Sequence, residues 1–157
     1  MNPSPSGYFN GGNNLLSSSP AEMQRYLGRI SGPLLDRIDI HIEVNPVPFD
    51  KLSEETRGES SIEIRKRVIA ARNLQNKRFS SSPGMHYNAQ MTSKQIRQFC
   101  ALDKTSKELL KTAMERLGLS ARAYDRILKV SRTIADLAGE TTITTIHVSE
   151  AIQFRTL

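Results

Sequence analysis

The sequence predicts a mainly α-helical protein, in which a helical bundle over residues 60 to 157 follows an arm with one short β-strand. Three observations support this class. Apolar residues recur at helical spacing through most of residues 60 to 157. Strict alternation of apolar and polar residues occurs clearly only over residues 38 to 44. The chain has five Phe, four Tyr and no Trp, so its core must be built mainly from aliphatic side chains, which favours helix packing.

The arm begins with a segment that cannot build a core. Residues 1 to 20 consist mainly of Ser, Asn, Gly and Pro, which bury too little to offset their ordering entropy, so we expect a loop. Pro20 stands where helices start, and residues 21 to 27 allow about two helical turns. A turn at residues 31 to 33 and a short helical piece containing Leu34, Leu35 and Arg37 follow.

Residues 38 to 44 are predicted to form a β-strand. Ile38, Ile40, Ile42 and Val44 would face one side and polar residues the other. A strand needs a hydrogen-bonding neighbour, and no second strand is legible in the sequence. We therefore expect its sheet partner to lie upstream of residue 1 or in another copy of the chain, which indicates a truncated protein.

The first bundle helix is predicted from residue 62 to about residue 79, capped by Ser60 or Ser61. The expected core stripe consists of Ile64, Val68, Ala71 and either Gln75 or Leu74. Residues 80 to 91 are expected to form a loop, and a short helix follows from Thr92 or Ser93 to Phe99.

Three further helices complete the predicted bundle. Residues 104 to 117 place apolar side chains on one face and stop at Gly118. Ser120 is expected to cap the next helix, which Gly139 ends, and the last helix begins near His147. The stripe of the second of these helices contains Tyr124, Ile127, Leu128, Ser131, Ile134, Ala135 and Ala138.

Charge and cysteine content limit the function classes. The formal net charge of +6 and the pI of about 9.7 make nucleic acid a candidate partner, although the basic residues are scattered among 16 acidic ones. The single Cys100 excludes an intramolecular disulfide framework and a four-cysteine zinc site, and buried packing is favoured for it. Without a signal segment or a membrane-spanning apolar run, we expect a cytoplasmic protein with no membrane partner.

Two arginines are the strongest candidate functional residues. Arg37 follows a tight turn and a two-leucine anchor, so a rigidly held guanidinium there would suit phosphate oxygens, including those of another subunit's nucleotide. The alternative is a salt bridge to Asp36 or Asp39. Arg122 lies in the first turn of a helix, where a cation is disfavoured unless an anion binds there too. The alternative is an arginine that only contacts solvent.

Other catalytic classes find little support. His41, His86 and His147 are isolated from any metal-ligand partner at suitable spacing, so no metal site is expected. No Ser-His-Asp arrangement and no pair of carboxylates is legible, and self-contained hydrolase chemistry is therefore not expected.

Three separated motifs carry a family resemblance. They are Gln24-Arg25-Tyr26-Leu27 followed by Arg29-Ile30-Ser31-Gly32-Pro33-Leu34-Leu35-Asp36-Arg37-Ile38-Asp39, then Ala121-Arg122-Ala123-Tyr124, then Arg132-Thr133-Ile134-Ala135-Asp136-Leu137. Together they resemble the C-terminal third of the Mg chelatase-like AAA+ ATPases of the ComM and YifB type. The resemblance covers nearly the whole chain.

The resemblance implies an architecture and site roles. Residues 1 to 50 would be the C-terminal remnant of the ATPase core, and residues 51 to 157 the helical lid. Asn2 looks like the polar sensor near the γ-phosphate, Arg37 like the arginine finger acting on a neighbour's ATP, and Arg122 like the second sensor. The cofactors would be ATP and Mg²⁺, and the partners other protomers of a ring. The intact protein would remodel DNA or migrate DNA branches.

The sequence also departs from the family. Many relatives carry cysteines where this chain has Pro3-Ser4-Pro5-Ser6-Gly7, so a metal-stabilised knuckle is not expected here. No Gly-rich phosphate-binding loop occurs in the 157 residues. We therefore expect that this chain alone neither binds ATP tightly nor hydrolyses it, although the intact protein would be an ATPase.

Two other functions stay open on sequence grounds. A stand-alone basic helical module could bind nucleic acid through Arg65, Lys66, Arg72, Lys77 and Arg78. Alternatively, the intact protein could be a metal-chelatase motor subunit of which this chain is the lid.

Overall fold

The computed structural model of the chain describes residues 19–44, 47 and 58–155. The chain divides into two compact units, residues 1–38 and 39–157, and each is described by itself. The boundary predicted at residues 50 and 51 lies outside the described residues. Among the described residues, no helix combines the length and the apolar character needed to cross a membrane.

The first unit contains α1 (Pro20–Leu27) and α2 (Gly32–Leu35). Ser19 starts α1 through a reciprocal capping box, in which its hydroxyl accepts from the Glu22 N–H and the Glu22 carboxylate accepts from the Ser19 N–H. The predicted helix starting at Pro20 is therefore confirmed. None of the residues from 19 to 38 is buried, so this unit has no core of its own among the described residues.

The strand predicted over residues 38 to 44 is not formed. These residues belong to no helix or strand, and in the described part of the chain the only β-bridge joins Leu102 to Ile143. The apolar face of the segment is open to solvent, with Ile42 71% and Val44 87% exposed. Alternation of side chains favours a strand, but the ladder also requires a second strand, and no described residue supplies one.

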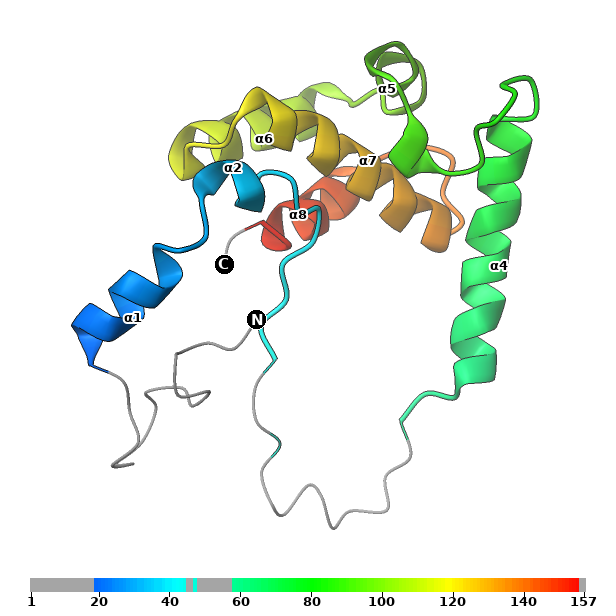
Figure 1. Cartoon of the computed structure of the whole chain (residues 1–157). Coiled ribbons are helices and arrows are strands. Elements are labelled where there is room, and N and C mark those ends of the chain that lie inside the picture. The colour runs from blue at the N-terminus through cyan, green and yellow to red at the C-terminus, as the bar shows by residue number, and fades with distance from the viewer. Residues whose placement is uncertain (1–18, 45–46, 48–57, 156–157) are drawn as a thin grey trace. The chain divides into compact units, whose positions relative to one another are not determined.

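The second unit is a helical bundle, and the predicted mainly α class is confirmed (Figure 1). α7 runs through its centre and contacts α4, α5, η1 and α8, while α6 packs against α8. The elements are α4 (Ser61–Arg78), the short 3-10 helix η1 (Asn88–Gln90), α5 (Ser93–Phe99), α6 (Lys104–Leu117), α7 (Ala121–Leu137) and α8 (Thr145–Gln153).

Local sequence signals set most helix ends. The Ser60 and Ser120 hydroxyls accept backbone N–H groups at the starts of α4 and α7, as predicted. Gly118 ends α6 with φ of 60°, a left-handed conformation that favours glycine. α8 begins at Thr145, earlier than predicted, because the ring of His147 accepts the Thr144 N–H at 3.1 Å and so extends the cap.

The core is mainly aliphatic and is centred on α7. Its buried side chains are Phe79, Met91, Ile96, Cys100, Leu102, Leu110, Ile127, Leu128, Ala135, Ile143, Val148, Ala151 and Ile152. The predicted stripe of α7 holds from Ile127 to Ala135 but fails at both ends. Tyr124 in the first turn is 40% exposed, and Ala138, the C-cap residue, is exposed as well. Cys100 packs in the core as predicted, and burial raises the pKa of its thiol to about 11.

The predicted core stripe of α4 is only half correct. Ala71 and Gln75 are buried, whereas Ile64 is 43% and Val68 45% exposed. Every residue from 61 to 70 is exposed, so only the C-terminal part of α4 packs on the bundle (Figure 1). The periodicity identified the correct face of the helix, but the described chain covers that face only near its end.

Candidate functional site at the start of α7

The first half of α7 lines a hollow of about 270 Å³. Ser120 holds the helix start, where its hydroxyl accepts the Ala123 N–H at 3.3 Å. From this start, three cationic side chains follow at helical spacing along one side, and Asp125 joins them. The lining residues are Asp39, Ala89, Arg122, Asp125, Arg126 and Lys129. Arg126 and Lys129 thus continue the face of α7 that begins with Arg122.

Two of the three cations already have partners. Arg126 forms an ion pair with the carboxylate of Asp39, and Lys129 donates to the backbone carbonyl of Ala89 at 2.9 Å. The side chains of Arg126 and Asp39 are 32% and 48% exposed, so the ion pair stabilises the fold by only about 0 to 1 kcal/mol. A ligand anion could therefore compete with Asp39 at little cost.

Arg122 differs from its neighbours. Its side chain is exposed and makes no hydrogen bond or ion pair with any residue that the structure describes. It also lies at the positive end of the α7 dipole, where a cation costs about 0.3 to 1 kcal/mol. An unpaired guanidinium at such a place is suited to an anionic ligand, because the ligand would neutralise both the side chain and the helix end.

Arg37 lies in the first unit, directly after α2. Its backbone N–H bonds to the Leu34 carbonyl at 2.9 Å and its side chain is exposed. The alternative of an ion pair to Asp39 is not observed, since Asp39 pairs with Arg126. Asn2, the third predicted site residue, lies outside the described residues.

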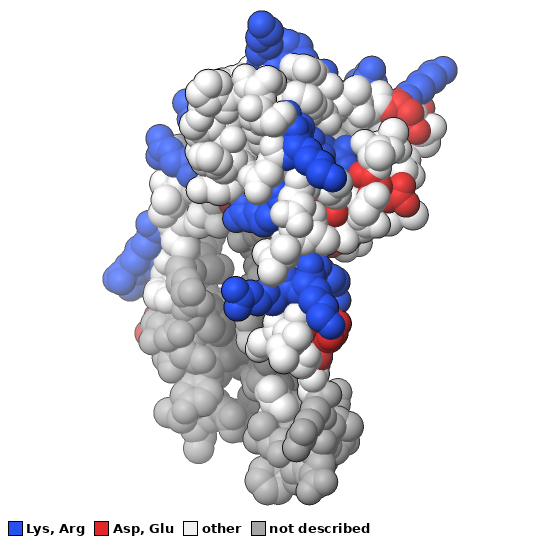
Figure 2. All heavy atoms as spheres, turned by 90° about the vertical axis from the view of Figure 1, so that its right-hand side faces the viewer, with Lys and Arg blue, Asp and Glu red and all other residues white. Residues whose placement is uncertain are grey.

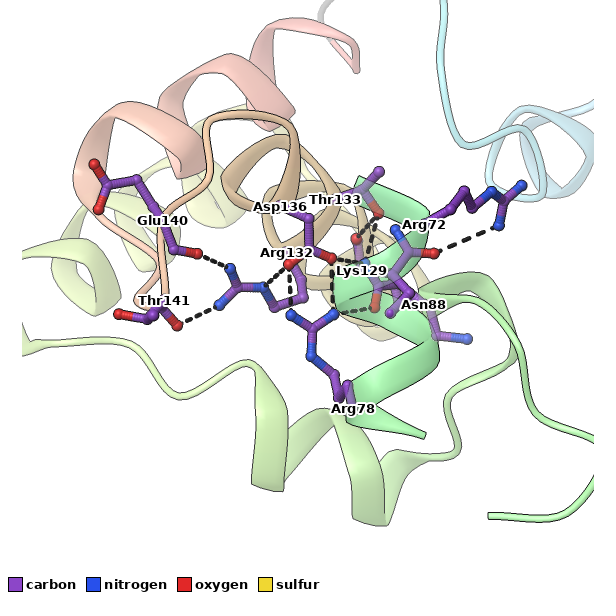
Figure 3. A network of polar contacts seen from close by, with 10 residues as sticks. Arg72, Arg78, Asn88, Lys129, Arg132, Thr133, Asp136, Glu140 and Thr141 are labelled. Atoms are coloured by element: carbon purple, nitrogen blue, oxygen red, sulfur yellow. Dashed lines mark hydrogen bonds and ion pairs between the residues drawn. The ribbon is translucent and has the colours of Figure 1, made fainter. Parts of the chain in front are cut away.

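A buried polar network at the other end of α7 was missed by the sequence reasoning (Figure 3). The Asp136 carboxylate accepts two bonds from the Arg78 guanidinium, one from the Asn88 amide at 2.8 Å and one from Arg132 at 3.1 Å. Asp136 is fully buried, and the side chains of Arg132 and Arg78 are 3% and 15% exposed. The network fastens α4 and η1 to the last turns of α7.

The partners of Asp136 favour its ionised form. Burial opposes ionisation of Asp136, but the hydrogen bonds and charges of its partners outweigh burial and hold the pKa of that carboxyl below its ordinary value. The remaining donors of Arg132 reach the carbonyls of Glu140 and Thr141. The available sequence signal was that residues 132 and 136 follow the buried Leu128 at spacings of four, which places an opposite-charge pair on the core side of the helix.

Several basic residues of the alternative nucleic-acid module have partners within the chain. Arg78, which the alternative of a stand-alone module would use to bind nucleic acid, is held by Asp136. Lys66 pairs with Glu63 at 2.7 Å, and the Arg72 guanidinium lies 4.5 Å from the centre of the Tyr87 ring. On the face that includes α4, basic side chains gather in several groups, with neutral and acidic side chains between the groups (Figure 2).

No metal centre is evident in residues 19–44 and 58–155, where no three His, Cys, Asp or Glu side chains gather. His147 instead caps α8 through its ring nitrogen.

Comparison with known families and proteins gives a consistent result. Residues 58–155 match the family described as magnesium chelatase, subunit ChlI C-terminal, and residues 1–52 match magnesium chelatase, subunit ChlI. The whole chain is 44% identical to the competence protein ComM of Haemophilus influenzae and 42% identical to the uncharacterised protein YifB of Escherichia coli. It spans 30% of the length of each. An uncharacterised protein of Mycobacterium bovis is 36% identical over 86% of the chain.

Proposed function

Because the chain belongs to the magnesium chelatase subunit ChlI family, whose C-terminal part it matches, we propose that it supplies the lid and the subunit contact of an AAA+ ATPase ring. Residues 51 to 157 would form the lid and residues 1 to 50 the end of the ATPase core. The curated relatives are about three times longer, so the activity is proposed for the longer protein.

One observation carries the proposal. Arg122 is exposed, lines the hollow at the start of α7 and has no partner among the described residues, whereas Arg126 and Lys129 on the same side are engaged. In the proposed function Arg122 binds the phosphates of the nucleotide held by its own subunit. Its fixed positive charge would stabilise the negative charge that develops during phosphoryl transfer.

Arg37 is proposed to act across the subunit boundary as an arginine finger, and Asn2 to sense the γ-phosphate. Both roles rest on the family resemblance. Neighbouring protomers would be the partners, and ATP with Mg²⁺ the cofactors. Mg²⁺ would bridge the β- and γ-phosphates in the part of the ATPase that supplies the phosphate-binding loop.

A chimera tests these roles directly. The region of the Haemophilus influenzae relative that precedes the matched residues would be joined to this chain, and ATP hydrolysis would be measured. Arg37→Ala is expected to lower kcat about a thousandfold or more, as for other arginine fingers. Arg122→Ala is expected to weaken nucleotide binding as well. The matched control is Arg65→Ala, an exposed arginine of α4 for which hydrolysis should be unchanged.

Mixed rings separate the two roles. If Arg37 serves a neighbour, protomers carrying Arg37→Ala should recover activity when mixed with protomers whose phosphate-binding loop is inactivated. If Arg122 serves its own subunit, no such recovery should occur between Arg122→Ala and loop-inactivated protomers. Recovery in the second mixture, or none in the first, would contradict the assignment.

The chain by itself is proposed to be inactive, because it has no phosphate-binding loop. Purified residues 1 to 157 should show no ATPase activity and only weak nucleotide affinity. Hydrolysis by this chain that disappears on Arg37→Ala would refute this part of the proposal.

DNA remodelling or branch migration is the work we propose for the longer protein. If the α4 basic residues instead made a separate nucleic-acid module, the isolated chain would bind DNA with an affinity that falls steeply with salt. The proposal expects weak binding or none, measured by fluorescence anisotropy. A metal-chelatase motor is the remaining alternative, and metal insertion by the chimera in place of DNA-stimulated hydrolysis would favour it.

A further inference from the structure

α4 is divided into an attached part and a free part. Its residues buried in the bundle are Ala71 and Gln75, and the Phe79 ring that follows the helix packs edge-on against Phe99, with ring centres 5.7 Å apart. Residues 61 to 70 are all exposed. At 1.5 Å per residue, about 15 Å of helix extends beyond the bundle.

Besides its apolar packing, α4 is attached to the bundle by a bidentate ion pair between Arg78 and Asp136. Arg78, in the last turn of α4, donates hydrogen bonds to both carboxylate oxygens of Asp136 on α7. Its Nη1 also donates to the side-chain oxygen of Asn88 at 2.7 Å (Figure 3). A bidentate guanidinium–carboxylate contact fixes orientation as well as distance, because its two bonds are parallel and coplanar. A second cation, Arg132, holds the same carboxylate from within α7.

Nothing inside α4 provides a hinge. The helix contains neither glycine nor proline over its 18 residues, and the Arg72 guanidinium stacks on Tyr87 near the point where the helix leaves the bundle. Bending within α4 would break backbone hydrogen bonds, so movement of α4 requires movement of its attachment.

We propose that α4 is a rigid arm whose direction is set by the Arg78–Asp136 joint, so that a rotation of α7 is carried to the free end of α4. Arg122 and Asp136 lie 14 positions apart on α7, about 21 Å along one continuous helix. The suggestion that an anion bound at Arg122 drives this rotation rests on the proposed function. The rigid joint does not, and it can be tested in the isolated chain.

Spin-label distances measure the joint directly. Nitroxides on Ile62→Cys in α4 and Lys107→Cys in α6 report the arm, and a second pair on Lys107→Cys and Glu150→Cys reports the bundle itself. All three positions are exposed. Cys100 should not compete for label, since it is buried and burial raises its pKa to about 11.

Substitutions at Arg78 then test whether its contact with Asp136 sets the direction of α4. Arg78→Gln removes the bidentate contact but leaves Asp136 with Arg132 and Asn88, and the matched control Lys77→Gln removes an exposed positive charge one residue away. We expect one narrow arm distance in the otherwise unaltered chain and in Lys77→Gln, and several or a broad distribution in Arg78→Gln. The bundle distance should stay narrow in all three.

Each other outcome overturns the proposal. A broad arm distance without the Arg78 change means that α4 is not rigid, and an arm distance in Arg78→Gln as narrow as in the control means that Arg78 does not set its direction. If the bundle pair also broadens in Arg78→Gln, Arg78→Lys replaces it, because lysine keeps the charge and loses the two-pronged geometry. A narrow arm in a folded Arg78→Lys chain would equally refute the joint.

Discussion

Replacing Asp136 by asparagine should destabilise the bundle strongly. The change removes the charge that Arg78 and Arg132 share, and it turns one acceptor into a donor facing other donors. Breaking a buried ion pair from one side typically costs about 3 to 5 kcal/mol. We expect the lower end, about 3 kcal/mol, because Arg132 keeps two backbone carbonyls and the Arg78 side chain is 15% exposed.

This loss is large against the total stability of a domain, about 5 to 15 kcal/mol. For a domain of about 100 residues it corresponds to a fall in Tm of about 12 to 24 °C. Urea titration followed by circular dichroism measures it, and Asp125→Asn on the same helix is the matched control, since no described residue pairs with Asp125. A loss below about 1 kcal/mol, or one equal to the control, would refute the reasoning.

Three further outcomes are expected. Arg122→Ala should leave the free energy of unfolding unchanged or raise it by up to about 1 kcal/mol, because it removes a cation from a helix N-terminus; a clear loss in urea titration would show that Arg122 is structural. The contribution of Asp136 to the free energy of unfolding should be fully present above about pH 4. It should decline as the pH falls through the lowered pKa of Asp136, since the folded state binds that proton less readily. In thermal melts across pH, the Tm of Asp136→Asn should therefore fall less steeply at acid pH. Gly118→Ala should cost about 1 kcal/mol by strain alone, because φ is 60° and a Cβ there meets no atom within 4 Å; an unchanged Tm would contradict this.

The features that were predictable from the sequence are local ones. Ser60, Ser120 and Gly118 act through neighbours three to four residues away, so their side-chain chemistry determines where the helices start and stop. Arg122 could be singled out for the same reason, because a cation in a first turn conflicts with the helix dipole whatever surrounds it.

The features that escaped prediction depend on distant partners. Arg78 meets Asp136 across 58 residues and Arg126 meets Asp39 across 87, and no spacing rule reports such pairs. Periodicity identified the face of α4 that carries Ile64 and Val68, but it cannot tell whether another helix covers that face. The alternation of residues 38 to 44 likewise describes one strand and not the second that it needs.

Because Asp39 pairs with Arg126, an anion in the hollow and the carboxylate of Asp39 would compete for the same guanidinium. An anion that recruits Arg126 has to displace Asp39, so binding in the hollow and attachment of residue 39 are negatively coupled, and the coupling is equal in both directions. Asp39 is two residues from Arg37 along the backbone. If the hollow binds an anion as proposed, that anion would compete with an ion pair that contributes only about 0 to 1 kcal/mol.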